Sequence, residues 1–344
     1  MADSDFVVRD SDEEDRPRTR LVRWSVGWTE PPAQHRLWAG FSAEEWASRH
    51  FFREFVAEVD GMIAARVGLE AFCPPFAEIS DLSVRPEFRR GGLGRTLTQK
   101  CLGEAAKRNF VAVFLQTELD NSAAHHLYRG MDFFPATQGK MLRMVRFVDY
   151  PLLASFRYRY PLNQYRCTPL PDASNRCQME WSAYVKESYL RLELTGGATK
   201  SESDGVAPAL RAFDWRSAEE ERGLEVTFDS ESLHDIEPEH YVELTIRARN
   251  HGKRAESGIF EMILPPGVRV SSPRTNQKKV FQWELAPGEE LLQAVEVQIE
   301  ADFDSSVLWY LNYGSLPISM ETYWSGHRAL LSTSLPMAIP PPTE

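Results

Sequence analysis

A glycine-rich turn between an apolar segment and an amphipathic segment constrains this chain more than any other feature. The turn contains Gly91, Gly92 and Gly94, and it follows residues 79–84, which predict a strand. Residues 93–108 carry apolar side chains at helical spacing, which predicts a helix packed on a sheet. The first N–H groups of a helix lack internal partners, and its dipole adds roughly half a positive charge there. The turn therefore predicts an anion site, in which glycines let a phosphate approach the bare backbone.

Length and charge limit the classes of protein that remain. The chain has 344 residues, which is usual for two domains, and its net charge of −11 argues against general affinity for nucleic acid or acidic membranes. It contains no run of eighteen apolar residues, and its acidic first thirty residues lack a signal-length apolar segment. Its four cysteines are too few for a disulfide scaffold. We therefore expect a cytoplasmic protein that binds neither nucleic acid nor a membrane.

The segments that precede the turn suggest an antiparallel start to a sheet. Asp60-Gly61 is a strong two-residue turn signal between two strand-like segments. Strands are expected at residues 6–9, 51–59 and 62–72, and a short helix is expected at residues 41–49.

The segments that follow the helix predict a parallel crossover. Residues 111–115 form a continuous apolar run, as expected for a strand covered on both faces, and their distance from residue 84 suits a βαβ unit. Asn121 is a good N-cap for a helix that runs to about Gly130. The last strands of this half are expected at residues 133–134 and 141–147.

Two motifs in this order resemble those of a known superfamily. The first is Arg89-x-x-Gly92-x-Gly94 after a strand, and the second is Asn121-x-x-Ala124-x-x-Leu127-Tyr128 followed by Phe133. Together with the order of elements, they make residues 5–148 similar to the GNAT superfamily of acyl-CoA-dependent N-acyltransferases. The resemblance implies an α+β fold, with a GNAT-type mixed sheet and flanking helices over residues 1–148. One departure is Asp132, which stands where the family usually has glycine and puts the course of residues 130–140 in question.

The resemblance also implies a cosubstrate, acetyl-CoA. Its pyrophosphate would lie on the backbone amides of residues 90–95, and its pantetheine arm would lie along residues 82–84, in a gap between two parallel strands. Other nucleotide motifs fit poorly, because no Lys-Ser or Lys-Thr follows Gly94. The implied coenzyme A ligands are Leu82, Ser83, Val84, Arg89, Arg90, Gly91, Gly92, Leu93, Gly94, Arg95 and Asn121.

Acyl transfer to an amine requires a held thioester, a neutral amine and a proton for the departing thiolate. Asn121, His125 and Tyr128 lie within nearly two helical turns, so they project from one face and can converge on one ligand. The resemblance implies that Tyr128 donates the proton to the coenzyme A sulfur. The alternative for Tyr128 is an aromatic side chain that packs against the sheet.

Two residues are candidates for the general base, Glu78 and Asp81, and Asp81 is slightly preferred. Both residues lie on or beside the strand that leads to the glycine turn, where the family often places a carboxylate that acts through water. In an ideal strand their side chains would point in opposite directions unless a bulge intervenes. In the alternative, each carboxylate is salt-bridged or solvated.

The second half of the chain has a different residue pattern. Residues 149–222 read as an extended connector with some β structure, and residues 336–344 as a disordered tail. Residues 223–335 alternate short strands with Gly and Pro turns, which predicts an antiparallel sandwich and loosely resembles immunoglobulin-like modules. Cys167 and Cys177 lack further Cys or His partners in ligand spacing, so no metal site is predicted. The strands are expected at residues 224–228, 241–249, 258–264, 268–270, 279–285, 291–301, 306–310 and 318–324.

The function expected from these features is acetyl-CoA-dependent N-acetyl transfer by direct attack in a ternary complex. The acceptor is a primary amine on a small molecule or a protein, and the sandwich presents the substrate or binds a protein or glycan partner. The alternative is a non-catalytic protein that binds acyl-CoA as a scaffold or sensor and docks a partner through the sandwich. The sequence does not name the acceptor.

Overall fold

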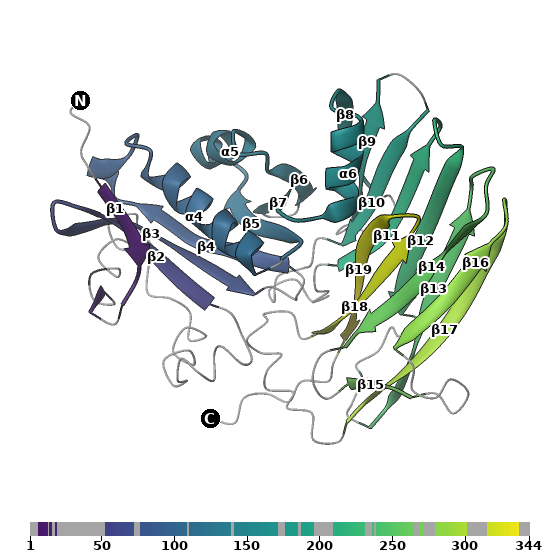
Figure 1. The fold of residues 1–344 in the computed structure, drawn as a ribbon. Coiled ribbons are helices and arrows are strands. Elements are labelled where there is room, and N and C mark those ends of the chain that lie inside the picture. Colours follow the sequence, from purple (N-terminus) through teal and green to yellow (C-terminus); the bar gives the residue numbers. More distant parts are fainter. Residues whose placement is uncertain are drawn as a thin grey trace. The chain divides into compact units, whose positions relative to one another are not determined.

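The computed structural model divides into two compact units (Figure 1). The first unit comprises Met1–Phe134 and Lys140–Val148, and the second comprises Pro135–Gly139 and Asp149–Glu344. The helix predicted at residues 41–49, the strand predicted at 306–310 and residues 337–344 of the predicted tail lie outside the described residues. No described helix is long and apolar enough to cross a membrane. The structure describes residues 6–12, 14–15, 18, 52–71, 76–108, 110–138, 141–170, 176–184, 187–195, 209–230, 236, 239–264, 268–271, 279–300 and 315–336.

The strands of the first unit belong to a seven-stranded mixed sheet in the order β1-β2-β3-β4-β5-β7-β6, of which β6 lies almost entirely in residues counted with the second unit. Helix α4 lies across one face of this sheet, over β2 to β5 (Figure 1). The strands are β1 (Phe6–Asp10), β2 (Phe52–Val59), β3 (Met62–Ala71), β4 (Phe76–Val84), β5 (Ala112–Glu118), β6 (Phe134–Gln138) and β7 (Met141–Phe147). The helices are η2 (Pro86–Phe88), α4 (Leu93–Lys107) and α5 (Ser122–Arg129).

The predicted hairpin and crossover are confirmed. Asp60 and Gly61 join β2 to β3 with φ of 50° and 72°, the left-handed pair that a two-residue hairpin turn requires. Strands β4 and β5 are parallel, with α4 between them in the chain. Their pairing stops at Ile79 and Leu115, although β4 continues to Val84 and β5 to Glu118. The two strands therefore separate beyond this point.

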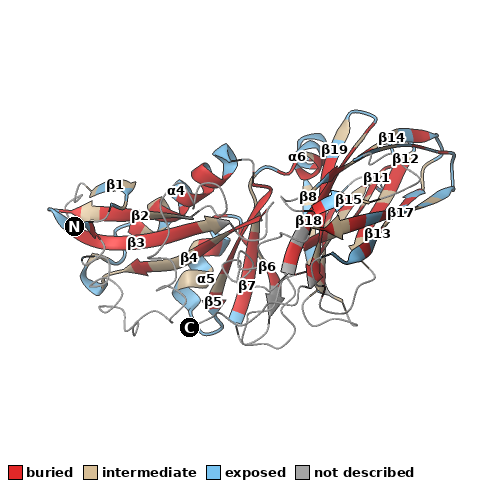
Figure 2. Ribbon diagram, turned by 90° about the horizontal axis from the view of Figure 1, so that it is seen from below, coloured by how far each residue is buried: buried red, intermediate tan, exposed pale blue. Residues whose placement is uncertain are grey.

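The core of the first unit lies between the sheet and the two α-helices. Side chains at helical spacing on α4, including Leu97 and Cys101, contact the apolar face of β2 to β5. Tyr128 and Phe133 complete this core from α5 and the segment after it. Figure 2 shows the buried residues following the strands of this sheet and the inner side of α4.

The second unit contains two antiparallel sheets, of eight and four strands. They contact each other face to face, because the ring of Phe213 on β11 stacks on Trp324 of β18 with centroids 5.1 Å apart. The eight-stranded sheet has the order β15-β17-β13-β12-β11-β10-β9-β8, and the four-stranded sheet has the order β16-β14-β18-β19. Its elements are α6 (Pro151–Arg159), β8 (Asn163–Pro169), β9 (Arg176–Ala183), β10 (Tyr189–Thr195), β11 (Ala209–Ser217), β12 (Arg222–Ser230), β13 (Tyr241–Asn250), β14 (Glu256–Ile263), β15 (Val268–Val270), β16 (Val280–Leu285), β17 (Glu290–Ile299), β18 (Ser315–Trp324) and β19 (His327–Pro336).

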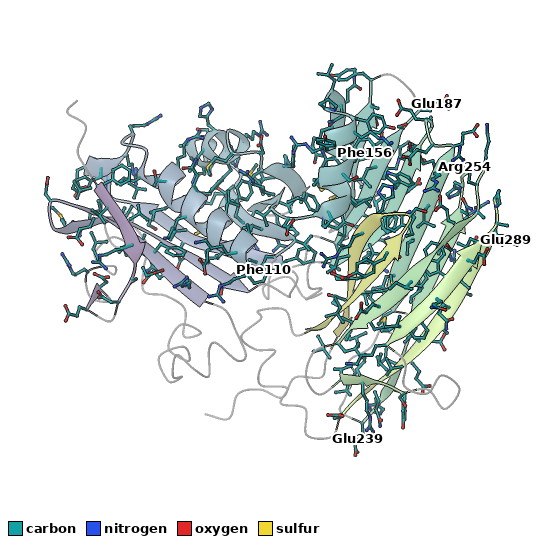
Figure 3. All side chains as sticks on the ribbon, in the orientation of Figure 1. Phe110, Phe156, Glu187, Glu239, Arg254 and Glu289 are labelled. Carbon is teal, nitrogen blue, oxygen red and sulfur yellow. The ribbon has the colours of Figure 1, made fainter. Side chains whose placement is uncertain are left out.

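The segment expected to be an extended connector, residues 149–222, is largely built into this second unit. Pro151 begins α6, and this helix buries Leu152, Leu153 and Phe156; the last is labelled in Figure 3. The strands that follow bury alternate apolar side chains and join the same sheet as β12 and β13. The connector was expected because the sequence lacks a helical period here, but a nine-residue helix is too short for one to stand out. The sequence analysis also missed β19.

Candidate active site

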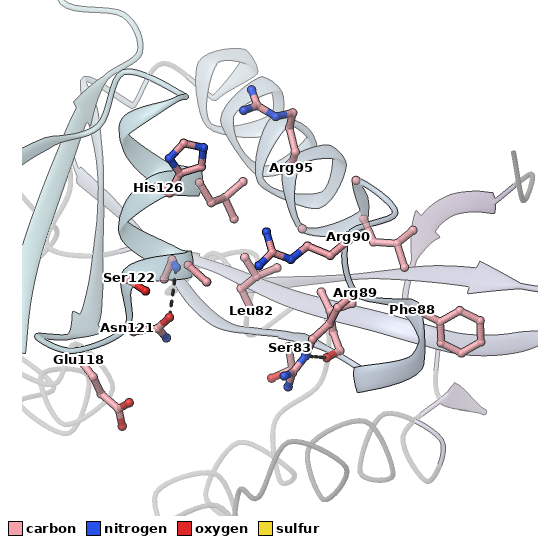
Figure 4. Close-up of a pocket in the computed structure, with 17 residues that line it drawn as sticks. Leu82, Ser83, Phe88, Arg89, Arg90, Arg95, Glu118, Asn121, Ser122 and His126 are labelled. Atoms are coloured by element: carbon pink, nitrogen blue, oxygen red, sulfur yellow. Dashed lines mark hydrogen bonds between the residues drawn. The ribbon is translucent and has the colours of Figure 1, made fainter. Parts of the chain in front are cut away.

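A cavity of about 840 Å³ lies where β4 ends and α4 and α5 begin (Figure 4). The separation of β4 from β5 opens this end of the sheet, and the first residues of both helices complete the walls. Ten of the eleven coenzyme A ligands expected from the sequence line it, and Gly91 is the exception. The lining residues are Leu82, Ser83, Val84, Phe88, Arg89, Arg90, Gly92, Leu93, Gly94, Arg95, Glu118, Asn121, Ser122, Ala123, Ala124, His126 and Leu127.

The backbone of the glycine turn explains why α4 presents its amino end to the cavity. Arg90 and Gly92 have φ of 69° and 85°, and Gly92 is the N-cap of α4 without a side chain to cap it. The first N–H groups of the helix therefore have no capping side chain and point toward the cavity end of the helix. The requirement for glycine is conformational at Gly92, whereas an added Cβ at Gly94 would meet only ordinary contacts with Leu127.

Three arginines surround this helix end, and they are held differently. Nε of Arg89 donates to the carbonyl of Val84 at 3.2 Å, and Nη1 of Arg95 donates to the carbonyl of Gly130 at 3.2 Å. In Figure 4 the side chain of Arg90 extends across the cavity toward α5. The arginines and the helix dipole together give this end of the cavity a positive potential, which suits a phosphate ligand.

Helix α5 places Asn121, His125 and Tyr128, which the sequence puts on one helix face, in different surroundings. Oδ1 of Asn121 caps the helix by accepting from the N–H of Ala124 at 3.1 Å, and Asn121 also lines the cavity. Nε2 of His125 lies 2.9 Å from the carbonyl oxygen of Glu118, and the described lining contains His126 in its place. Tyr128 is buried and is not among the described lining residues. The structure thus brings Asn121 to the cavity and separates His125 and Tyr128 from it.

Tyr128 packs between α5 and the core. Its side chain is 6% exposed, and its ring lies 5.6 Å from that of Phe133. Burial raises the pKa of the Tyr128 hydroxyl well above its usual value, and the neighbouring Cys101 thiol adds to the effect. The hydroxyl therefore keeps its proton at neutral pH. Asp132 follows with φ of 60°, so it adopts the left-handed conformation that the family's usual glycine would favour.

A β-bulge in β4 decides where Glu78 and Asp81 point. Residues Arg66 and Gly68 of β3 pair with Ser83 and Ser80, so two residues of β4 lie opposite one residue of β3. Asp81 lies in this bulge with φ of 53°. The bulge lets Asp81 reach Arg66, whose Nη2 lies 3.6 Å from Asp81 Oδ2.

The bulge therefore places Glu78 and Asp81 among charged residues that were not predicted from the sequence to belong to the site. Glu78 lies directly opposite Glu70 of β3. The positive charge of Arg143 on β7 favours the ionised form of Glu78. Arg66 also bonds Glu54 of β2, with Nη2 to Oε1 at 2.6 Å. The pairing of Glu70 with Glu78 could not be read from the sequence, because the register of β3 with β4 depends on the bulge.

Burial and neighbouring charges distinguish the two candidate bases, Glu78 and Asp81. Burial raises the pKa of Glu78 to about 7, with a contribution from Asp81 and an opposing one from Arg143. Burial, Glu78 and Asp81 raise the pKa of Glu70 to about 8, against the hydrogen bond from Ser80. Asp81 instead has the guanidinium of Arg66 beside it. Among these carboxyl groups, Glu78 is best matched to accept a proton near neutral pH.

The fold and the cavity define the first unit as a domain that binds an anionic, extended ligand between a split sheet and a helix amino end. Residues 13–133 match the family described as the acetyltransferase (GNAT) family, so this part of the chain is a GNAT domain. GNAT acetyltransferases use acetyl-CoA, and ten of the eleven ligands implied by the resemblance line the cavity.

Known proteins similar to this chain match the same region. The chain is 27% identical over 120 residues to the [ribosomal protein bS18]-alanine N-acetyltransferase of Escherichia coli K12, covering 33% of this chain and 80% of the relative. The corresponding protein of Salmonella typhimurium is 36% identical over 61 residues, 18% of this chain and 41% of its own length. A solved structure, the PaiA N-acetyltransferase of Thermoplasma acidophilum with coenzyme A, is 19% identical with a TM-score of 0.33, covering 42% of this chain and 99% of its own. The family match and these relatives support an N-acetyltransferase as the class of enzyme.

Proposed function

We propose that this protein transfers the acetyl group of acetyl-CoA to a primary amine by direct attack in a ternary complex. The observation that carries the proposal is the cavity itself, in which the open end of β4, the amino end of α4 and Asn121 of α5 meet. The pyrophosphate binds the first N–H groups of α4, with Arg90 beside it, and the pantetheine arm lies along Leu82–Val84.

In the proposed reaction, Glu78 is the general base. The acceptor arrives as an ammonium ion and loses one proton to the Glu78 carboxylate, directly or through a water molecule, because only the neutral amine is a nucleophile. Asp81 remains paired with Arg66 and holds that cation in place. This assignment reverses the slight preference for Asp81 that the sequence suggested.

Tyr128 is the proton donor to the leaving group. The amine nitrogen attacks the thioester carbonyl, the C–S bond breaks, and the thiolate takes the proton of the Tyr128 hydroxyl. The nitrogen loses its second proton as the amide forms, and this proton restores the Tyr128 hydroxyl by way of water. The buried environment of Tyr128 keeps the hydroxyl proton on the oxygen until the thiolate forms.

The acceptor that we propose is the amine of a protein, with an N-terminal α-amine first in order. The relatives are named for acetylating an alanine of a ribosomal protein, and this is the support for testing protein N-termini before small amines. The experiment is acetyl-CoA turnover, measured as released thiol, with a panel of N-terminal peptides, lysine peptides with blocked N-termini, and small polyamines. Transfer to a primary amine supports the proposal. Binding of coenzyme A by calorimetry without transfer to any amine would favour the scaffold alternative.

A further inference from the structure

Two cysteines of the second unit form a pair that acetyl transfer does not use. Cys167 lies on β8 and Cys177 on the neighbouring antiparallel strand β9. Cys177 pairs with Pro169 and Cys167 pairs with Met179, so the two cysteines are diagonal neighbours on the same face of the sheet. Both are free thiols.

The surroundings of the two thiols differ in a way that assigns each a role. Cys167 is partly exposed, and Cys177 is only 1% exposed. The interaction with the Cys177 thiol lowers the pKa of Cys167 to about 7, whereas the interaction with Cys167 and burial raise the pKa of Cys177. A partly exposed thiolate beside a buried thiol is the arrangement of redox-sensitive cysteine pairs.

We propose that Cys167 and Cys177 form a peroxide-sensitive site, in which Cys167 is oxidised first and Cys177 then closes a disulfide bond between β8 and β9. The Cys167 thiolate attacks a hydroperoxide, so an S–O bond forms, the O–O bond breaks, and the released oxygen leaves as water or an alcohol. The thiol of Cys177 then attacks the sulfenic sulfur, so the S–S bond forms, the S–O bond breaks, and the second oxygen leaves as water with the thiol proton. Two thiols are oxidised and one peroxide is reduced.

The position of β8 makes the second step feasible. Diagonal neighbours on ideal strands stand about 7–8 Å apart at Cα, somewhat farther than a disulfide bond prefers. The two thiols are close enough for each to shift the pKa of the other. Among the strands that the structure describes, β8 is the last of its sheet and pairs only with β9, so it can approach β9 without breaking a second set of strand contacts.

The experiment exposes the full-length protein to hydrogen peroxide and follows thiol loss and peptide masses. We expect a cross-linked peptide pair containing Cys167 and Cys177, with the loss of two thiols. Cys177→Ser is expected to stop at a sulfenic acid on Cys167 that dimedone traps, and Cys167→Ser is expected to abolish the fast reaction. The fully buried Cys101, whose pKa is raised by burial, is the internal control and should react far more slowly.

The pH dependence of the oxidation rate separates this proposal from simple exposure of a cysteine. Because the pKa of Cys167 is about 7, half of its thiol is ionised at pH 7, so we expect the rate to rise only about twofold between pH 7 and pH 9. An ordinary cysteine with a pKa of about 8.5 would gain more than tenfold over the same range. Equal oxidation rates at Cys167 and Cys101, or a Cys177→Ser variant without trapped sulfenic acid, would overturn the proposal. Circular dichroism of each variant checks that the second unit remains folded.

Discussion

At the scale of single residues, Tyr128 meets one of the two requirements of a proton donor to a thiolate. Burial keeps its hydroxyl protonated, but its side chain is not among the described residues that line the cavity. The same burial fits a purely structural aromatic side chain, because the ring packs on Phe133. These two interpretations of Tyr128 differ in whether catalysis uses the hydroxyl.

Tyr128→Phe should separate these interpretations, because it removes the hydroxyl and keeps the ring packing. We expect kcat to fall about 10²-fold or more, the usual contribution of a positioned general acid, with little change in coenzyme A affinity. Turnover assays and calorimetry measure the two quantities. A variant with wild-type kcat would show that Tyr128 is only a core residue.

Glu70 and Glu78 give the stability of the first unit a pH dependence with a definite sign. Their pKa values in the folded state, about 8 and about 7, exceed the ordinary value of 4.5. Between pH 4.5 and 8 the folded state binds more protons than the unfolded state, so the free energy of unfolding decreases as the pH rises through this window.

Glu70→Gln should reduce this decrease, because one of the two opposed carboxylates is removed. We expect the variant to gain stability relative to wild type at pH 8 and to gain little at pH 5. Denaturant unfolding at both pH values tests this, with Glu58→Gln as the control, since that carboxylate on β2 is paired with Arg9 of β1 at 3.0 Å. An equal effect of Glu70→Gln at both pH values would contradict the assignment.

At the scale of elements, the sequence was informative where local signals are strong. Asp60-Gly61, the Asn121 cap and the apolar run at β5 predicted a hairpin, a helix start and a parallel crossover that the structure contains. The bulge at Asp81 was not predictable, because a non-glycine residue with positive φ leaves no compositional signal. It decides which residues accompany Glu78, so the charged surroundings of the base could not be derived from the sequence.

The amino end of α4 depends on the conformation of Gly92. Gly92→Ala adds a methyl group that meets nothing within 4 Å, so we expect only the cost of a left-handed alanine, about 1 kcal/mol. Gly92→Glu adds the same strain and a carboxylate beside the proposed pyrophosphate position. We expect it to abolish coenzyme A binding, measured by calorimetry, while the alanine variant retains binding within about tenfold. Equal affinities of the glutamate variant and wild type would refute the assigned phosphate site.

At the scale of the whole molecule, the start of the second unit was harder to predict from the sequence than the individual strands. The strand-rich texture of the second half predicted most strands from β12 onward. The place where the second unit begins was misread, because α6 is short and the apolar side chains of β8 to β10 alternate without a turn motif to mark them. A sheet of eight strands can be recognised only when its distant segments are brought together, and sequence periodicity does not report which segments pair.

The chain divides into two compact units and the cavity is lined by residues of the first, so we expect their stabilities to respond differently to the cosubstrate. Coenzyme A at 100 times its Kd stabilises the state that binds it by about 2.7 kcal/mol, which corresponds to roughly 5–10 °C for a unit of this size. We expect differential scanning calorimetry to resolve two transitions, of which only the one belonging to the first unit rises with coenzyme A. Gly92→Glu should remove this rise and leave the other transition unchanged. A single transition that rises as a whole with coenzyme A would instead mean that the two units unfold together.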